Sequence, residues 1–394
     1  MTILLKPFLG CNISCTYCYQ GDFREGQKPK MRYDVEAILK TTEHAKNTKG
    51  DDIVLHGGEP LTMPKKDVDA FLAKAYELQG RSGVQTNGTK IDDEFIAMFK
   101  KYKTHVGISY DGPGELSEFR EGSEHVKDVF PKLYKEGVSC STIAVVSRAN
   151  AGTPERFEKF KQHVVWLSSM RIYGRLNPTM YEGEGNWALE KERAVEVYVE
   201  LAKLNLSLGN KWSPFNDIIN GLQNKSRVCI FSGCDPFHTT AATVITGDGG
   251  VTNCMRVNRE GILMQHPAYH DTRGEILANV SQEHGGCKDC RYFSGCRGGC
   301  SGSVIDGDWR NRTEVCHIWK AVFGFYENVL RGLGVPINIS TKPLPRGNTA
   351  GNGCANRPPE NSHGDHHDSR GVQQPVFEMT NTPAKFLLEI PVNG

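Results

Sequence analysis

The sequence predicts an α/β fold in which helices cover a parallel sheet, followed by a cysteine-rich region and an irregular tail. Strand and helix patterns alternate from residue 2 to about residue 210, and eight of the 13 cysteines lie between residues 229 and 316. Beyond about residue 340 the chain turns to Pro, Gly, Asn and His. A chain of 394 residues exceeds what one hydrophobic core usually organises. We therefore expect domains over residues 1–210 and 211–335, and a tail over 336–394.

Six units of strand followed by helix are predicted in the first region. Apolar and β-branched runs predict the strands, and apolar residues at helical spacing predict the helices. The predicted strands are 2–7, 52–56, 83–86, 105–110, 139–146 and 171–176, and the predicted helices are 33–46, 65–78, 92–101, 125–134, 154–167 and 189–206. Such alternation implies a parallel sheet.

Unusual motifs follow four of these strands. They are the cysteine loop at 11–18, HGGEP at 56–60, QTNG at 85–88 and SYDG at 109–112. Ligands bind at the carboxyl ends of strands in parallel βα architectures. We therefore expect the four motifs to meet on one face of the sheet.

The region from 211 to 320 is rich in Gly and Cys and has few long periodic segments. Residues 241–253 predict a β-hairpin with a GDGG turn, and residues 316–330 predict a helix. Because this region has little apolar core of its own, we expect metal to hold it together.

Three cysteines on one short loop, Cys11, Cys15 and Cys18, indicate an iron–sulfur site. Three thiolates on a cubane with four irons leave one iron open for a non-protein ligand. The second group can saturate two further cubanes and consists of Cys229, Cys234, Cys254, Cys287, Cys290, Cys296, Cys300 and Cys316. Structural zinc is the alternative, above all for the second group, because C-x2-C pairs are common in zinc sites.

Composition and charge exclude several classes of partner. The net charge of +1, with both signs interspersed, argues against nucleic acid. No stretch approaches the roughly twenty apolar residues needed to cross a bilayer, and the N-terminus lacks a signal-peptide pattern. We expect a cytoplasmic protein, whose cysteines serve metal or redox chemistry rather than disulfides.

The spacing of the first three cysteines, with Tyr17 as the aromatic residue, matches C-x3-C-x-aromatic-C. The chain thus resembles the radical S-adenosylmethionine (SAM) superfamily over roughly residues 3–210. The resemblance implies a partial (β/α)6 barrel. It also implies that SAM occupies the open iron and is cleaved to a 5′-deoxyadenosyl radical, which abstracts a substrate hydrogen.

The same resemblance indicates which residues contact SAM. They are Tyr17, Gly57, Gly58, Glu59, Pro60, Asn87, Ser109 and Arg120. The GGEP motif contacts the SAM amino group in the family, and Arg120 resembles an arginine that binds the SAM carboxylate in related maturases. Two alternatives stay open: Arg120 is a solvated surface residue, and Asn87 only supplies the turn before Gly88.

The second cysteine group resembles the SPASM extension, which carries two auxiliary clusters. Cys234, Gly249 and Cys254 fit the first part of its pattern. The C-x2-C-x5-C-x3-C part is fitted by Cys287, Cys290, Cys296 and Cys300, Cys316 is the last cysteine, and Cys229 adds an eighth ligand. The resemblance implies an inner cluster on Cys229, Cys234, Cys254 and Cys300, and an outer cluster on Cys287, Cys290, Cys296 and Cys316. Complete ligation favours electron transfer.

Enzymes of this subfamily act mostly on peptides or proteins, by crosslinking or oxidising side chains. The expected partners are a peptide or protein substrate and a flavodoxin- or ferredoxin-type reductant. Since only ten residues precede Cys11, we expect any leader-peptide-binding domain to be absent or a separate protein. The alternatives are a dehydrogenase or epimerase of a small molecule and a non-enzymatic electron carrier. A carrier needs neither HGGEP nor an open iron.

The catalytic base is not evident. Anaerobic sulfatase maturases carry an Asp after the equivalent of Cys254, where this chain has Met255. Asp235 is a candidate base or a turn residue. Cys140 is expected to be a buried apolar residue. Cys354 lies in the tail, where residues 363–369 (HGDHHDS) bind a metal or form a solvated polar run.

Overall fold

The computed structural model describes residues 2–21, 32–49, 52–180, 187–225, 229–238, 242–254, 256 and 271–341. The chain divides into two units, Met1–Asn356 and Arg357–Gly394, and all described residues belong to the first. Cys354 and residues 363–369 of the tail lie outside the described residues, as does Met255.

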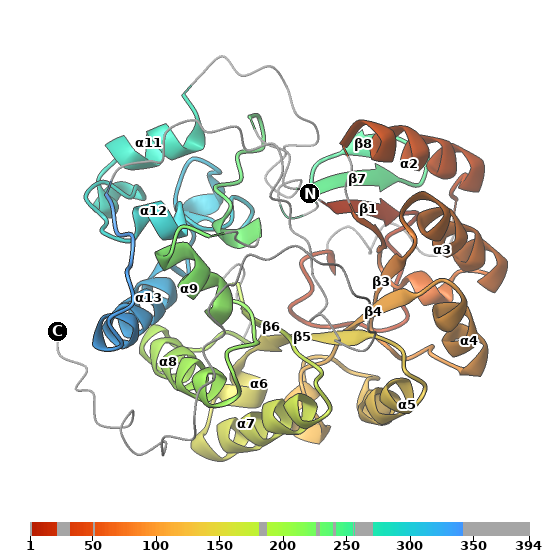
Figure 1. The fold of residues 1–394 in the computed structure, drawn as a ribbon, viewed down its shortest axis with the longest axis horizontal. Coiled ribbons are helices and arrows are strands. Elements are labelled where there is room, and N and C mark those ends of the chain that lie inside the picture. Colours follow the sequence, from red (N-terminus) through yellow and green to blue (C-terminus); the bar gives the residue numbers. More distant parts are fainter. Residues whose placement is uncertain are drawn as a thin grey trace, which may run out of the picture. The chain divides into compact units, whose positions relative to one another are not determined.

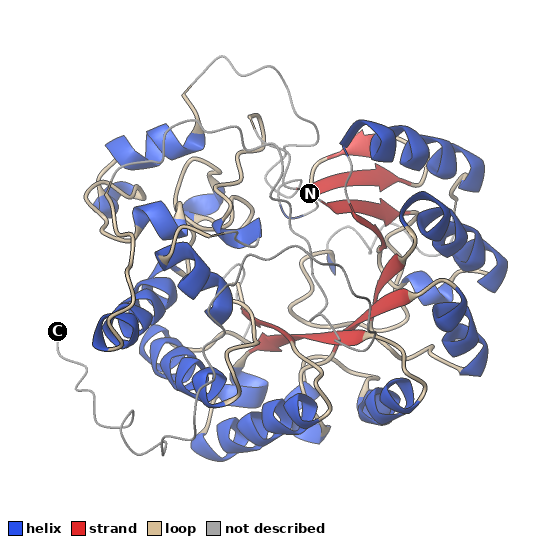
Figure 2. Cartoon of the chain, viewed as in Figure 1, coloured by secondary structure: helices blue, strands red, loops and turns tan. Residues whose placement is uncertain are grey.

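One curved sheet of eight strands runs through the described unit (Figures 1 and 2). Its strands are β1 (Thr2–Lys6), β2 (Asp52–Leu55), β3 (Ser82–Thr86), β4 (Thr104–Ser109), β5 (Cys140–Val146), β6 (Gly174–Pro178), β7 (Ala242–Thr246) and β8 (Val251–Thr252). The spatial order is β6-β5-β4-β3-β2-β1-β7-β8. The first six strands are parallel neighbours in chain order. The predicted partial (β/α)6 architecture is therefore confirmed.

Helices cover the outer face of this sheet (Figure 1). They are α2 (Val35–Lys49), α3 (Lys65–Gln79), α4 (Asp93–Lys101), α5 (Val129–Lys135), α7 (Pro154–Ser169) and α8 (Lys191–Ser207). Each buries one apolar face, as α3 does with Val68, Phe71, Leu72 and Ala75. In β5 every second residue is buried, so its other side chains point toward the inside of the curve.

Two predicted elements differ from the observed ones for local reasons. The predicted helix 125–134 is a 3-10 turn, η3 (Glu124–Asp128), followed by α5. Pro131 lies in the first turn of α5, where its missing N–H is tolerated. The predicted strand 171–176 begins only at Gly174, because Arg171 has a left-handed φ of 56° and closes the turn after α7.

The cysteine-rich region contributes to the same sheet. The predicted hairpin is present as antiparallel β7 and β8, and β7 pairs in parallel with β1, with Leu5 opposite Ile245. The helix α13 (Cys316–Gly332) packs on α8 and on α9 (Phe215–Leu222), which periodicity did not predict. The remaining short elements are η1 (Pro60–Thr62), η2 (Gly114–Ser117), α6 (Arg148–Ala151), η4 (Cys229–Phe231), α11 (Arg273–Asn279), η5 (Gln282–His284), α12 (Phe293–Cys296) and η6 (Ile305–Gly307).

Candidate active site and cysteine centres

The first cysteine loop follows β1 and is held against the loop that follows β2. The backbone amides of Gly58 and Glu59 donate to the carbonyls of Phe8 at 3.1 Å and Gly10 at 2.8 Å. A Cβ at Gly58 would lie 1.9 Å from the carbonyl oxygen of Gly10, so only glycine permits this approach. The HGGEP motif and the three-cysteine loop therefore form one assembly at the carboxyl end of the sheet.

Asp111, just after β4, organises the polar side of this loop. Its carboxylate is 1% exposed and accepts hydrogen bonds from the Tyr17 hydroxyl, from Arg120 Nε at 3.3 Å and from the Val145 amide at 2.8 Å. Arg120 Nη1 lies 3.7 Å from Cys15 Sγ. Burial lowers the pKa of Arg120, but Asp111, Tyr17 and Cys15 together raise it further than burial lowers it. Arg120 is thus a fixed cation beside the cysteine loop.

The alternative that Arg120 is a solvated surface residue is wrong, because the residue is only 7% exposed. Its guanidinium stands 5.6 Å from the centre of the Tyr17 ring. A cation over an aromatic face is favourable, and more so when both are removed from water. The sequence-predicted pair of Tyr17 and Arg120 is therefore brought together beside Cys15.

Glu59 is fully buried and is engaged by the protein itself. Its Oε1 accepts from the Leu61 amide at 3.0 Å and the Thr86 hydroxyl at 2.7 Å, and its Oε2 accepts from the Asn87 amide at 2.6 Å. Burial raises the pKa of Glu59, and these three hydrogen bonds oppose the rise. The carboxylate caps η1 and ties it to the end of β3. A carboxylate has about four acceptor positions, so one is left for a ligand.

Asn87 serves the turn and also meets the cysteine loop. Its Oδ1 accepts from the Thr89 amide at 3.0 Å, and its Nδ2 lies 3.0 Å from Asn12 Oδ1 and 3.7 Å from Cys11 Sγ. Asn87 therefore supplies the turn before Gly88 and also contacts the cysteine loop. Ser109, by contrast, accepts a hydrogen bond from Gln85 Nε2 at 3.0 Å across β3 and β4.

A group formed by the buried Lys6 and the half-buried Tyr19 and Arg256 links the first cysteine loop to Cys254. Lys6 Nζ lies 5.7 Å and Arg256 Cζ 5.6 Å from the centre of the Tyr19 ring. Burial lowers the pKa of Lys6 to about 8, while the thiols of Cys254 and Cys18 oppose this shift. Lys6 is therefore within electrostatic reach of both cysteine groups.

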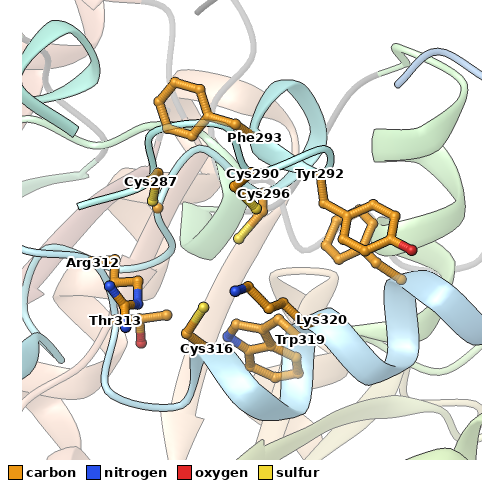
Figure 3. Close-up of a pocket in the computed structure, with 12 residues that line it drawn as sticks. Cys287, Cys290, Tyr292, Phe293, Cys296, Arg312, Thr313, Cys316, Trp319 and Lys320 are labelled. Carbon is orange, nitrogen blue, oxygen red and sulfur yellow. The ribbon is translucent and has the colours of Figure 1, made fainter. Parts of the chain in front are cut away.

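The four predicted outer ligands line one cavity. Cys287, Cys290, Cys296 and Cys316 surround about 320 Å³ of space, part of it open to solvent. Figure 3 shows these cysteines around the common space, with the amine of Lys320 and the guanidinium of Arg312 beside it. Burial raises the pKa of Cys287 to about 12, with Cys316 and Cys290 adding to the rise. Such thiols stay protonated until a metal displaces the proton.

Three of the four predicted inner ligands also lie together. Burial raises the pKa of Cys234 to about 11, and among the neighbouring charges that contribute to the rise are Cys300 and Cys254. Cys229 begins η4, where its carbonyl accepts from the Ser232 hydroxyl at 2.8 Å. Next to Cys300 lies a second cavity of about 380 Å³, bordered by Asn177 of β6, Thr179 just after β6, Arg256 and Ser303.

Both carboxylate oxygens of Asp235 accept hydrogen bonds, three of them from backbone amides. Its Oδ1 accepts from the amides of Phe237 at 2.9 Å and His238 at 3.2 Å, and its Oδ2 accepts from the Arg273 amide at 2.7 Å and His238 Nδ1 at 3.0 Å. Four donors occupy the acceptor positions of a carboxylate. This arrangement favours the turn role over that of a base.

Several residues at the site were not selected from the sequence. Asp111 had a local signal, since it is the acidic residue of SYDG, but the motif did not reveal that it binds Tyr17 and Arg120. Lys6, Arg256 and Arg273 had none, because their partners lie far away in the chain. Cys140 is buried in β5, as expected.

Residues 5–160 match the Radical SAM superfamily. With a three-cysteine loop after β1 and the parallel strands β1 to β5, this part of the chain is a radical SAM domain, and the protein is a radical SAM enzyme. It is related to anaerobic sulfatase-maturating enzymes. One such relative, the cysteine-type enzyme of Clostridium perfringens, is 24% identical over 348 residues, which cover 76% of this chain and 88% of the relative.

A serine-type anaerobic sulfatase-maturating enzyme of Bacteroides thetaiotaomicron is 32% identical over 183 residues, 41% of this chain and 43% of that protein. Among solved structures, native anSMEcpe with bound AdoMet and Cp18Cys peptide has a TM-score of 0.64 at 22% identity, covering 84% of this chain and 98% of the other. Streptococcus suis SuiB bound to S-adenosylmethionine has a TM-score of 0.52 at 15% identity, covering 80% and 76%. At these identities the structures establish the fold.

Membership in this superfamily implies SAM and a 4Fe-4S cluster, and the first cysteine loop suits both. N–H groups of Arg120 and Asn87 reach two of its sulfurs at 3.7 Å, as donors to cluster thiolates do. The fixed cation Arg120 lies beside Cys15, and the amide of Glu59 bonds to Gly10, just before Cys11. In the described part of the chain, no helix has the length and apolar character needed to span a membrane.

Proposed function

We propose that this protein is a cytoplasmic radical SAM/SPASM maturase that crosslinks or oxidises a side chain of a peptide or protein. The observation that carries the proposal is the match to the Clostridium perfringens enzyme, because it extends over both the sheet and the cysteine-rich region. The name of that relative and the Cp18Cys peptide bound to anSMEcpe support a peptide substrate. We assign residues 1–210 to the radical SAM core, 211–335 to the SPASM region and 336–394 to a tail.

The proposed ligand sets follow the grouping of the thiols. Cys11, Cys15 and Cys18 hold the SAM cluster, Cys229, Cys234, Cys254 and Cys300 the inner auxiliary cluster, and Cys287, Cys290, Cys296 and Cys316 the outer one. The shared cavity of the outer thiols and the closeness of three inner thiols support these sets. Two completely ligated clusters suit electron relay.

The residues around the first loop divide the binding of SAM between them. When bound, the cluster and SAM supply the radical that removes a hydrogen atom from the substrate. Arg120 offers a fixed guanidinium for the SAM carboxylate, and Glu59 offers its remaining acceptor position for the amino group. Asp111 holds Arg120 in place, and Gly58 lets the motif approach the loop.

The cavity beside Cys300 is the proposed place for part of the substrate. Asn177, Thr179, Ser303 and Arg256 give it polar groups, and Met180, Ile230 and Trp319 give it apolar walls. Such a mixture suits a peptide, whose backbone needs hydrogen bonds and whose side chains need apolar contacts. Arg256 also reaches Tyr19, next to the first cysteine loop. The cavity therefore lies close to the SAM site.

Two further assignments concern the chemistry and the partners. Met255 replaces the acidic residue that sulfatase maturases carry, which favours a product other than formylglycine. A flavodoxin- or ferredoxin-type protein is the proposed reductant, and a separate protein is the proposed binder of any leader peptide.

Anaerobic reconstitution and chromatography test the proposal. The reduced enzyme is expected to convert SAM to 5′-deoxyadenosine and methionine, with about twelve irons per chain from three cubanes. The Cys11→Ala/Cys15→Ala/Cys18→Ala variant should lose this activity and keep about eight irons. Full cleavage in that variant, or zinc in place of iron at the outer thiols, would contradict the assignment.

The substrate class needs a separate measurement. Deuterium transfer into 5′-deoxyadenosine from deuterated candidate peptides, among them the Cp18Cys peptide, is the expected result. Transfer only from small alcohols or sugars would favour a small-molecule dehydrogenase or epimerase instead.

A further inference from the structure

Among the described residues of the cysteine-rich region, Arg273 is the most deeply buried cation. It begins α11 and is 1% exposed. Its Nε donates to the Trp309 carbonyl at 2.6 Å, Nη1 donates to Gly299 at 3.0 Å, and Nη2 donates to Gly298 at 3.2 Å and Asn311 at 2.7 Å. Four carbonyl oxygens therefore fix the plane of the guanidinium.

These carbonyls belong to segments that carry cysteines of both auxiliary sets. Gly298 and Gly299 connect Cys296 of the outer set with Cys300 of the inner set. The loop through Trp309 and Asn311 leads to Cys316 of the outer set.

The inner set is also tied to the backbone of Arg273. Its amide donates to Asp235 Oδ2 at 2.7 Å, and Asp235 directly follows Cys234. Arg273 thus holds backbone segments that lie next to cysteines of both the inner and the outer set.

The glycine pair is built to present its carbonyls to this cation. Gly298 and Gly299 have φ angles of 79° and 74°, in the left-handed region. A Cβ at Gly298 would lie 2.3 Å from Leu277 Cδ1, and one at Gly299 would lie 2.5 Å from Thr313 Cγ2. Two successive left-handed residues aim both carbonyls at Arg273.

The charge of Arg273 needs a counter-charge. Burying a guanidinium without an opposite charge is strongly unfavourable. Within the described residues its guanidinium N–H groups bond to carbonyls and to no carboxylate. Burial lowers the pKa of Arg273, and the thiolates of Cys300, Cys234 and Cys287 oppose this, ahead of Asp235. The main counter-charges therefore come from both cysteine sets.

We infer that Arg273 is a shared positioning residue of the two auxiliary clusters, whose positive charge raises the reduction potentials of both. This inference rests on the proposed ligand sets. Reduction adds negative charge to a cluster, so a nearby fixed cation stabilises the reduced form. Because the same guanidinium lies near ligands of both clusters, it raises both reduction potentials together. The difference between the two potentials then changes little, which favours electron exchange between the clusters.

Two variants separate charge from position. Arg273→Gln removes the charge and keeps donors for the carbonyls, whereas Arg273→Lys keeps the charge and loses the planar fork. The reconstituted full-length protein is titrated potentiometrically with EPR detection, and the Cys11→Ala/Cys15→Ala/Cys18→Ala background identifies the auxiliary signals. We expect both midpoint potentials to shift to more negative values in Arg273→Gln and to stay near wild type in Arg273→Lys.

Arg312 provides a matched control. Its Nη1 donates to the Gly286 carbonyl at 2.9 Å, and its charge acts on Cys287 and Cys316, which both belong to the outer set. Arg312→Gln should therefore shift the outer cluster alone. If Arg273→Gln loses its clusters, their retention at wild-type potentials in Arg273→Lys supports the inference.

Three outcomes would overturn it: unchanged potentials in Arg273→Gln, a shift of one cluster only, or equal shifts in Arg273→Lys and Arg273→Gln. Iron analysis of the wild-type protein distinguishes a failure of the inference about Arg273 from a failure of the proposed function. A wild-type protein without about eight auxiliary irons defeats both, whereas normal iron with unmoved potentials defeats only the role of Arg273.

Discussion

The sheet region and the segment from 271 to 314 are stabilised in different ways. The sheet lies in a continuous apolar core in which Phe71, Val106 and Phe160 are fully buried. The segment has a separate core of three buried residues, Leu277, Cys287 and Phe293. Apolar burial of about 25 cal/mol per Å² supports the first region, and too little of it is present to support the second. Ligation by cysteines and the hydrogen bonds of Arg273 must do so instead.

Helix α13 connects the sheet region with the segment from 271 to 314. Its first residue, Cys316, lines the outer cavity, while Ile318, Val322 and Phe323 lie in the large core. One of the four outer ligands is therefore held in place without metal. The other three lie on the segment whose order we expect to depend on the cluster.

The largest expected effect is a loss of order in residues 271–314, while the sheet stays intact. Cys287→Ala/Cys290→Ala should remove the outer cluster, or about four irons. Amides of residues 271–314 should then exchange hydrogen far faster, because only a core of three residues holds them, while amides of β1 to β6 stay protected. Hydrogen exchange with mass spectrometry measures both regions. Equal loss of protection in the sheet would show that the two regions fold as one.

Asp111→Asn tests the sheet region at its site. The change leaves Arg120 buried without its carboxylate, and breaking such a pair costs about 3–5 kcal/mol. We expect weaker SAM binding, a lower rate of SAM cleavage and a lower unfolding temperature, with normal auxiliary iron.

Glu118→Gln is the matched control, since Glu118 pairs with Arg156 at 2.7 Å in the same segment but is half exposed. Its effect on stability should be below about 1 kcal/mol. SAM binding of wild-type strength in Asp111→Asn would remove Asp111 from the site.

The acid sensitivity of the sheet region should depend on His163. This residue lies on α7 against Trp166, at 5.6 Å between ring centres, and burial lowers its pKa from 6.5 to about 4, with Lys127 adding to the shift. Between pH 6.5 and about 4 the unfolded chain binds a proton on His163 that the folded chain does not bind. The free energy of unfolding therefore falls as the pH drops through this range. The loss amounts to about 3 kcal/mol.

His163→Phe should remove this part of the pH dependence. Unfolding midpoints at pH 7 and pH 5 give the measurement, with His284→Gln as a control on an exposed histidine. An unchanged difference between the two pH values in His163→Phe would mean that His163 does not contribute to the acid sensitivity.

Local patterns allowed the fold to be predicted, and distance in the chain set the limit. Alternating strands and helices, the cysteine loop and HGGEP are all encoded within a few residues, so each could be read directly. Arg273 bonds to carbonyls 25 to 38 residues away, and Asp111 bonds to Tyr17 94 residues away, so neither role has a local signature. Helices α11 and α12 span seven and four residues, too few to show a helical period.

The smallest expected effect belongs to a cysteine that lies in the sheet. Cys140 is 9% exposed in β5, and burial raises the pKa of its thiol to about 12. Replacing it with alanine removes one buried sulfur atom, which should cost about 1 kcal/mol, as for a buried methylene. Iron content and SAM cleavage should equal those of wild type, in contrast to any cysteine between 287 and 316. Thermal unfolding and iron analysis of Cys140→Ala check this. A loss of iron there would mean that the sheet also depends on a metal, and the contrast between the two regions would then be wrong.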